Sequence, residues 1–261
     1  MTAIDFDVIS RIGDERIEGT ELGVFVRDLG TGESFGINEN RDFPSASTVK
    51  ILILAGLAEA VAEGRLSLDD KLGASEDIRL TGSGVVNWLD KNLELTLRDH
   101  AWLMTAISDN SSSNVLMNAV GIPEINEVGK RLNVGKLYMG RNFMDRNFPP
   151  GPGKNRAEAE GLVNVLTAIY QDAIATPELC AWMRQLLGDQ QHTDRLARHL
   201  PEGVTYAGKT GTISGIAHDC GVLEGANGKV AVAVLTQGFA NLYDADRLIG
   251  RIGTALGEMV S

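Results

Sequence analysis

The sequence has little cysteine and no long apolar run. Cys180 and Cys220 are the only cysteines among 261 residues, and neither belongs to a Cys-x-x-Cys pair. This excludes a disulfide framework. We expect two free thiols in the core, because unpaired cysteine behaves as a small hydrophobic residue. No stretch approaches the roughly 18 apolar residues of a membrane-spanning helix, so no such helix is expected.

Positive charge is also scarce, with 24 Lys and Arg residues against 35 Asp and Glu residues and a formal net charge of −11. An acidic surface repels phosphate backbones and anionic lipid headgroups, so neither nucleic acid nor a membrane is an expected partner. The first residues lack the apolar segment of a signal peptide. We therefore expect a cytoplasmic protein, or an extracytoplasmic one if an export signal has been removed.

The sequence also lacks the common motifs for metals and phosphates. The four histidines show no metal-ligand spacing, and residues 151–154 (GPGK) lack the rest of a phosphate-binding loop. A Gly-x-Ser-x-Gly nucleophile motif is absent as well. We expect a small-molecule substrate and no cofactor or metal, while the sequence specifies no oligomeric state.

What the sequence does contain is typical of a globular protein. Hydrophobic residues make up 43% and charged residues 23%, which excludes a disordered or fibrous chain. A chain of this length buries a substantial core, in one large domain or two small ones.

Strand patterns lie near both ends of the sequence and helix patterns fill the middle. Residues 48–63 are apolar almost all round, which predicts a buried helix. Residues 139–157 are irregular and rich in proline and glycine. We predict strands at 21–28, 33–38, 203–209, 216–223 and 229–237, and helices at 4–13, 48–63, 97–107, 111–119, 123–132, 158–172, 177–188, 191–199 and 242–258.

This order predicts an α+β fold. Segments 1–46 and 200–261 would form an antiparallel sheet flanked by terminal helices, and 47–199 would be an inserted all-helical domain. A cleft between the two parts is the natural place for a ligand.

Three short motifs stand out. Ser-x-x-Lys occurs once, at residues 47–50; Ser-Asp-Asn occurs once, at 108–110; Lys-Thr-Gly occurs once, at 209–211. One such match is weak, but three in this order and structural context are specific. Ser47 lies at the start of the buried helix and Lys50 follows one turn later on the same face. A desolvated lysine favours its neutral form and can activate a serine, which is a poor nucleophile alone.

With these motifs, the chain resembles the class A β-lactamases and penicillin-binding proteins over nearly its whole length. Residues 43–46, 97–99 and 208–215 extend the likeness. The resemblance implies the mixed fold described above. It implies that Ser47 is the nucleophile beside Lys50, that the backbone N–H groups of Ser47 and Thr212 form the oxyanion hole, and that Ser108 delivers a proton to the leaving nitrogen. It assigns substrate contacts to Asn110, Lys209, Thr210 and Gly211.

The segment for deacylation departs from this family. Class A β-lactamases carry Arg-x-Glu-x-x-Leu-Asn where this chain has residues 141–147 (RNFMDRN), so Phe143 stands in the glutamate position. Asp145 is the candidate replacement, whereas Glu158 and Glu160 are expected on a helix. His218, after the Lys-Thr-Gly motif, is interpreted as a structural residue, with substrate contact as the alternative.

Three functions follow as hypotheses. The first is a β-lactamase-like serine hydrolase that forms an acyl-enzyme at Ser47 with a β-lactam or a related carboxylate-bearing amide or ester. The second is a penicillin-binding protein or sensor that acylates without turnover, which Phe143 favours. The third is a cytoplasmic biosynthetic transacylase or esterase, consistent with the absence of an export signal.

Overall fold

A computed structural model describes residues 6–15, 17–144 and 154–261. Its centre is a five-stranded antiparallel sheet in the order β2-β1-β9-β8-β7. The strands are β1 (Glu21–Asp28), β2 (Ser34–Ile37), β7 (Thr205–Ile213), β8 (Ile216–Gly225) and β9 (Gly228–Gln237).

The two ends of the chain meet in this sheet. Strand β1 pairs with β9 along its whole length, from Glu21 opposite Gln237 to Asp28 opposite Val230. Strands β8 and β9 are buried along most of their length because helices cover both faces of the sheet. The predicted α+β class, with an antiparallel sheet built from both termini, is confirmed.

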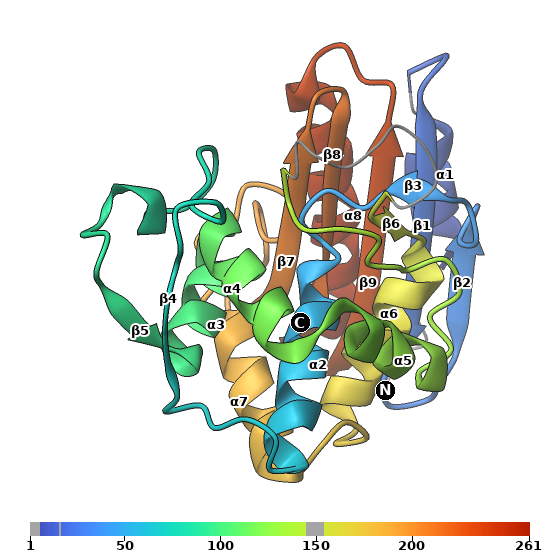
Figure 1. The fold of residues 1–261 in the computed structure, drawn as a ribbon. Helices are drawn as coiled ribbons and strands as arrows, with labels where there is room; N and C mark the ends of the chain where they lie inside the picture. Colours follow the sequence, from blue (N-terminus) through green and yellow to red (C-terminus); the bar gives the residue numbers. More distant parts are fainter. Residues whose placement is uncertain (1–5, 16, 145–153) are drawn as a thin grey trace.

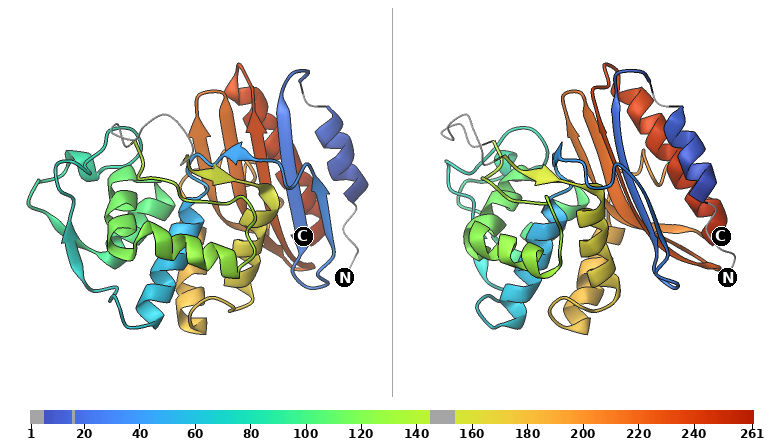
Figure 2. Two further views of the ribbon diagram at one scale, coloured as in Figure 1. Left: turned by 45° about the vertical axis from the view of Figure 1, so that its right-hand side comes forward. Right: turned by 90° about the vertical axis from the view of Figure 1, so that its right-hand side faces the viewer.

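Two helices cover one face of the sheet and the helical region covers the other. Helices α1 (Phe6–Asp14) and α8 (Leu242–Val260) lie side by side on the first face (Figure 2). Their apolar residues pack with Val24, Val232 and Ile249 in one core cluster. The opposite face packs mainly against α6 (Ala159–Tyr170) and α7 (Pro177–Gly188).

Helix α2 (Lys50–Ala62) runs through the middle of the helical region (Figure 1). Ten of its 13 residues are buried, as its continuous apolar sequence predicts. The helices around it are α3 (Leu97–Ala106), α4 (Asn110–Val120), α5 (Ile122–Arg131), α6 and α7. No helix in the described part of the chain is long and apolar enough to cross a membrane.

One predicted helix was wrong, and the predicted buried helix begins two residues later than expected. Helix α2 begins at Lys50, because residues 46–49 form a turn. Residues 191–199 form turns instead of a helix. In that segment the N–H of Leu196 donates to Asp219 Oδ2 at 3.0 Å, so a tertiary contact takes a hydrogen-bond donor that a helix would need.

Short elements were also missed by the sequence patterns. Strand β3 (Phe43–Pro44) pairs with β6 (Arg156–Ala157), which ties the chain just before Ser47 to the end of the irregular segment. Strand β4 (Lys71–Gly73) pairs with β5 (Glu94–Thr96), and a 3-10 turn, η1 (Val86–Trp88), lies between them in sequence. Strands of two or three residues carry too little periodicity to be predicted.

Candidate active site

Ser47 lies in the turn that connects β3 to α2. The N–H of Thr48 donates to Ser45 O at 3.1 Å, and the N–H of Lys50 donates to Ser47 O at 3.2 Å. The turn therefore carries Ser47 directly into the N-terminal end of α2. At that end the helix dipole favours developing negative charge.

A polar hollow of about 150 Å³ opens at Ser47, between the helical region and strand β7. We call it the Ser47 pocket. Of the residues predicted from the motifs, it brings together Ser47, Ser108, Thr210 and Thr212. It is lined by Ser47, Ser83, Ser108, His192, Asp194, Arg195, Thr210 and Thr212.

Lys50 is buried directly behind this pocket, with 1% of its surface exposed. Its Nζ lies 2.7 Å from Ser108 O, 3.1 Å from Ser108 Oγ and 3.0 Å from Asn110 Oδ1. Burial lowers the pKa of Lys50 well below the usual lysine value, and the charge of Lys209 lowers it further, against the opposing effect of Asp109. Nζ donates in these contacts, which hold the amine against both oxygens of Ser108.

Ser108 is held in a backbone conformation that few residues adopt. Its φ is +60°, in the left-handed region that costs energy for a residue with a Cβ. The next residue, Asp109, caps α4 by accepting from Ser112 N at 2.8 Å, and its other oxygen accepts from Val85 N and Val86 N. The Ser-Asp-Asn motif thus fixes both α4 and the loop that carries Ser83.

Strand β7 forms the opposite wall and is an edge strand of the sheet. Lys209 is fully buried, and its Nζ donates to Thr210 O at 2.9 Å. The pKa of Lys209 is lowered to about 8, mainly by burial and also by the charge of Arg195, while Cys220 and Asp219 act in the opposite direction. Lys209 therefore acts on the pocket from behind its wall, through its positive field.

Gly211 allows β7 to approach the backbone of Ser47. A Cβ at residue 211 would lie 2.8 Å from Ser47 N and 3.1 Å from Thr48 N. Both neighbours are main-chain atoms, which cannot rotate away as a flexible side chain can. Glycine is therefore required for the close approach of Ser47 to Thr212 that an oxyanion hole between their N–H groups needs.

We expect Gly211→Ala to slow acylation by about 10²–10³-fold, the usual cost of losing one oxyanion donor. The added methyl group would push β7 away from Ser47. Stopped-flow measurement of acyl-enzyme formation checks this, with Gly188→Ala as the control because a Cβ there meets no atom within 4 Å. Equal acylation rates for Gly211→Ala and wild type would exclude the role assigned to this approach.

Phe143 takes the place of a carboxylate beside Lys50. Its ring centroid lies 4.6 Å from Lys50 Nζ. The main chain of Phe143 is clamped by Asn114, which accepts from Phe143 N at 2.9 Å and donates to Phe143 O at 3.2 Å. An apolar ring therefore occupies the position where the resemblance expects a base. Asp145, the predicted replacement, lies outside the described residues.

Sequence reasoning missed Arg195, the most extensively bonded charged residue at the pocket. Its guanidinium donates to Asp246 Oδ1 at 2.7 Å, to Thr212 Oγ1 at 2.7 Å and to the main-chain oxygens of Gly211 and His218. It adds positive charge next to Thr212, where a substrate carboxylate is expected. Because residues 191–199 were expected to form a helix, Arg195 was not recognised as part of the pocket wall. The same applies to His192 and Asp194, which line the same wall.

His218 has a structural role. It is fully buried, its Nε2 contacts Pro44 O at 2.9 Å, and its Nδ1 accepts from Thr236 N at 3.0 Å. Burial lowers the pKa of His218 to about 4, so the ring is neutral at pH 7. Cys180 and Cys220 are free and buried, as predicted.

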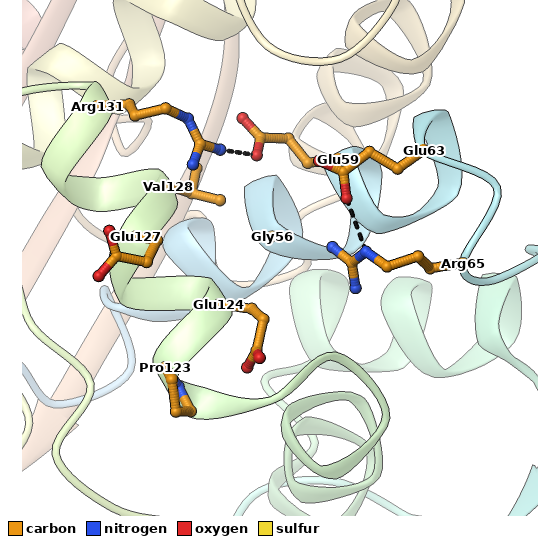
Figure 3. Close-up of a pocket in the computed structure, with 9 residues that line it drawn as sticks. All are labelled: Gly56, Glu59, Glu63, Arg65, Pro123, Glu124, Glu127, Val128 and Arg131. Carbon is orange, nitrogen blue, oxygen red and sulfur yellow. Dashed lines mark hydrogen bonds and ion pairs between the residues drawn. The ribbon is translucent and has the colours of Figure 1, made fainter.

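A second, larger hollow lies between α2 and α5. It has a volume of about 380 Å³, and its carboxylates are partly paired with arginines, Glu59 with Arg131 and Glu63 with Arg65 (Figure 3). It holds no serine, lysine or histidine among its lining residues. The predicted site residues therefore lie at the smaller Ser47 pocket.

Comparisons with known proteins agree with this geometry. Residues 7–260 match the model of the Beta-lactamase enzyme family. A β-lactamase crystal structure from Sphaerobacter thermophilus superimposes with a TM-score of 0.92 at 31% identity, covering 98% of both chains. The structure of PBP-A shares the fold, with a TM-score of 0.89 at 22% identity over 98% of this chain and 97% of that one.

Curated relatives are more distant in sequence. Beta-lactamase CARB-4 of Pseudomonas aeruginosa is 24% identical and aligns over 92% of this chain and 85% of its own length. Beta-lactamase regulatory protein BlaB of Streptomyces cacaoi is also 24% identical, over 88% of this chain and 89% of its own. Because the family model spans nearly the whole chain, the protein belongs to the Beta-lactamase enzyme family, as a distant homologue of the class A β-lactamases and PBP-A.

Proposed function

We propose that the protein forms an acyl-enzyme at Ser47 with a β-lactam, or a related amide or ester that bears a carboxylate, and hydrolyses it slowly. The observation that carries this proposal is the buried Lys50 amine. It lies next to the nucleophile's turn and is held by Ser108 and Asn110. Burial of Lys50, with Lys209 nearby, favours the neutral amine.

Acylation would begin with transfer of the Ser47 hydroxyl proton to Lys50 Nζ as Ser47 Oγ attacks the carbonyl carbon. The developing oxyanion would be bound by the N–H groups of Ser47 and Thr212. As the C–N bond breaks, Ser108 would donate its hydroxyl proton to the leaving nitrogen and regain a proton from Lys50, to which it is hydrogen-bonded at 3.1 Å. No proton is gained or lost overall.

The substrate carboxylate would bind at the β7 wall. Thr210 and Thr212 line the pocket there, and the charges of Lys209 and Arg195 lie behind and beside them. Two cations near one wall of an otherwise acidic protein favour an anionic group at that position. Asn110 Nδ2 remains the proposed donor to the amide of the substrate's acyl side chain.

The proposed slow hydrolysis of the acyl-enzyme is based on Phe143, which stands in the position of the deacylation glutamate. Hydrolysis of an acyl-enzyme requires a base that activates water, and a hydrocarbon ring can neither accept a proton nor hold a water molecule by hydrogen bonds. The L158E variant of PBP-A has been solved as an acyl-enzyme complex with penicillin-G, so an acyl-enzyme forms on this fold. The two alternative functions, a penicillin sensor and a biosynthetic transacylase or esterase, stay hypotheses.

The test is rapid mixing of the protein with a chromogenic cephalosporin. Wild type is expected to release a burst of one product equivalent per protein molecule, followed by slow turnover. Ser47→Ala is expected to abolish the burst and to keep the circular-dichroism spectrum of wild type, because Ser47 lies in a turn outside the core. A burst from folded Ser47→Ala protein would exclude Ser47 as nucleophile. Fast linear turnover by wild type would instead support an efficient hydrolase.

A further inference from the structure

Gln190 and Gln191 bind the C-terminal end of α3. The last carbonyl groups of a helix have no partner within the helix. Here Gln190 Nε2 donates to Thr105 O at 3.0 Å, and the N–H of Gln191 donates to Ala106 O at 3.0 Å. Two consecutive residues thus bind two consecutive carbonyl groups at the end of the helix.

The side-chain amide of Gln190 also reaches the sheet. Its Nε2 makes a second donation, to Gly208 O on β7, at 3.2 Å, and its Oε1 accepts from His192 N at 3.0 Å. Gln190 is 5% exposed, so water cannot readily replace these bonds. The amide uses both of its N–H groups and its oxygen, which fixes its position and orientation.

The two carbonyl groups joined by this amide each precede a motif of the site. Thr105 lies three residues before Ser108, and Gly208 lies directly before Lys209. Ser108 has the strained φ of +60°, which persists only when surrounding contacts hold it. Because Lys50 Nζ is bonded to both oxygens of Ser108, a shift of Ser108 would also move the base.

We propose that Gln190 is a positioning residue for acyl transfer: by bonding Thr105 O and Gly208 O with one amide group, it fixes the Ser-Asp-Asn wall of the Ser47 pocket against the Lys-Thr-Gly wall. Gln190 itself does not line the pocket. This inference rests on the proposed acylation at Ser47. It accounts for a buried glutamine that the acylation chemistry does not use.

Gln190→Met keeps the length of the side chain and removes all three hydrogen bonds. We expect it to slow acylation at saturating cephalosporin by about 10- to 100-fold, the effect of a small displacement of catalytic groups. The concentration for half-maximal acylation should change much less, because the carboxylate-binding residues remain. Stopped-flow burst kinetics over a range of substrate concentrations separates the two quantities.

The matched control is Asn126→Leu. Asn126 makes two hydrogen bonds with the main chain of Met139, at 2.8 and 2.9 Å, and does not line the Ser47 pocket. Its loss should lower the unfolding temperature without slowing acylation. If Gln190→Met acylates at the wild-type rate, or if both variants slow acylation equally, the positioning role is wrong.

A second variant keeps the test valid if Gln190→Met does not fold. Gln190→Glu places a carboxylate against the carbonyl oxygens of Thr105 and Gly208, and an ionised carboxylate only accepts hydrogen bonds. When protonated it regains one donor. Its acylation rate relative to wild type is therefore expected to rise as the pH is lowered. A ratio that stays constant with pH contradicts the proposal.

Failure of acylation in wild type would refute the proposed function but would still leave this inference testable. The N–H of Asp109 donates to Leu103 O and the N–H of Asn110 donates to Ser83 O, both next to Ser108. In Gln190→Met these two amides should exchange with deuterium about tenfold faster. They should exchange at the wild-type rate in Asn126→Leu. Unchanged exchange in Gln190→Met would overturn the inference.

Discussion

Replacing Phe143 with glutamate is expected to accelerate deacylation by about 10²–10⁴-fold, the usual contribution of a general base. The ring of Phe143 lies 4.6 Å from Lys50 Nζ, and Asn114 clamps its main chain from both sides. A glutamate on this fixed backbone would place a carboxylate beside Lys50, where it can bind and activate water. Decay of the acyl-enzyme, followed by intact mass after removal of free antibiotic, measures the effect.

The control is Phe143→Gln, which introduces a polar side chain of the same length as glutamate but no base. Its deacylation rate should be at most about tenfold higher than that of wild type, because an amide can hold water without accepting its proton. Similar acceleration by glutamine and glutamate would mean that water access, rather than base catalysis, limits release.

Phe143→Glu should also change the pH dependence of acylation. The proposed acylation requires neutral Lys50, so its rate is expected to fall as the pH decreases through the pKa of this lysine. A carboxylate nearby favours the ammonium form and raises that pKa. The acid limb of the acylation rate is therefore expected to move to higher pH in Phe143→Glu, and acylation at neutral pH should become slower as deacylation becomes faster.

Lys50→Met is expected to lower the acylation rate by about 10²–10⁴-fold, because it removes the base and keeps most of the side-chain volume. The effect should be on the rate at saturation, since Lys50 does not line the pocket. Stopped-flow acylation at high substrate concentration measures it. Lys91→Met is the control, because Lys91 is exposed and forms an ion pair with the exposed Glu76.

In wild-type protein, the acylation rate should depend on pH as expected for a base with the lowered pKa of Lys50. Burial lowers the pKa of Lys50 well below the ordinary lysine value, so acylation should be nearly constant at pH values above this lowered pKa and should fall below it. An acid limb that persists unchanged in the residual activity of Lys50→Met would assign the titration to another group.

Much of the fold could be predicted because its main elements carry their own patterns. The strand over residues 21–28 was predicted with its observed bounds, and the buried helix α2 followed from apolar residues on every side. Residues 191–199 could not be predicted, because Asp219 binds the backbone N–H of Leu196 from a distant strand. Such a contact leaves no periodic signal in the local sequence.

The candidate site shows the same division. One hollow is lined by Ser47, Ser108 and Thr210, predicted from the three short motifs, and by Thr212, which the family resemblance implied. Arg195 was missed because its meaning depends on partners far along the chain, including Asp246 and Thr212. Phe143 was identified from the sequence, whereas Gln190 was not, because its role depends on contacts with Thr105 and Gly208 that lie far from it in sequence.

The most direct test of the central claim is the intact mass of wild-type protein after brief exposure to excess benzylpenicillin and removal of the free drug. The account predicts one added penicilloyl group, located by peptide mapping on the peptide that contains Ser47, absent from Ser47→Ala, and lost slowly. Absence of an adduct together with absence of any hydrolysed penicillin, or an adduct on a different residue, would contradict acylation at Ser47.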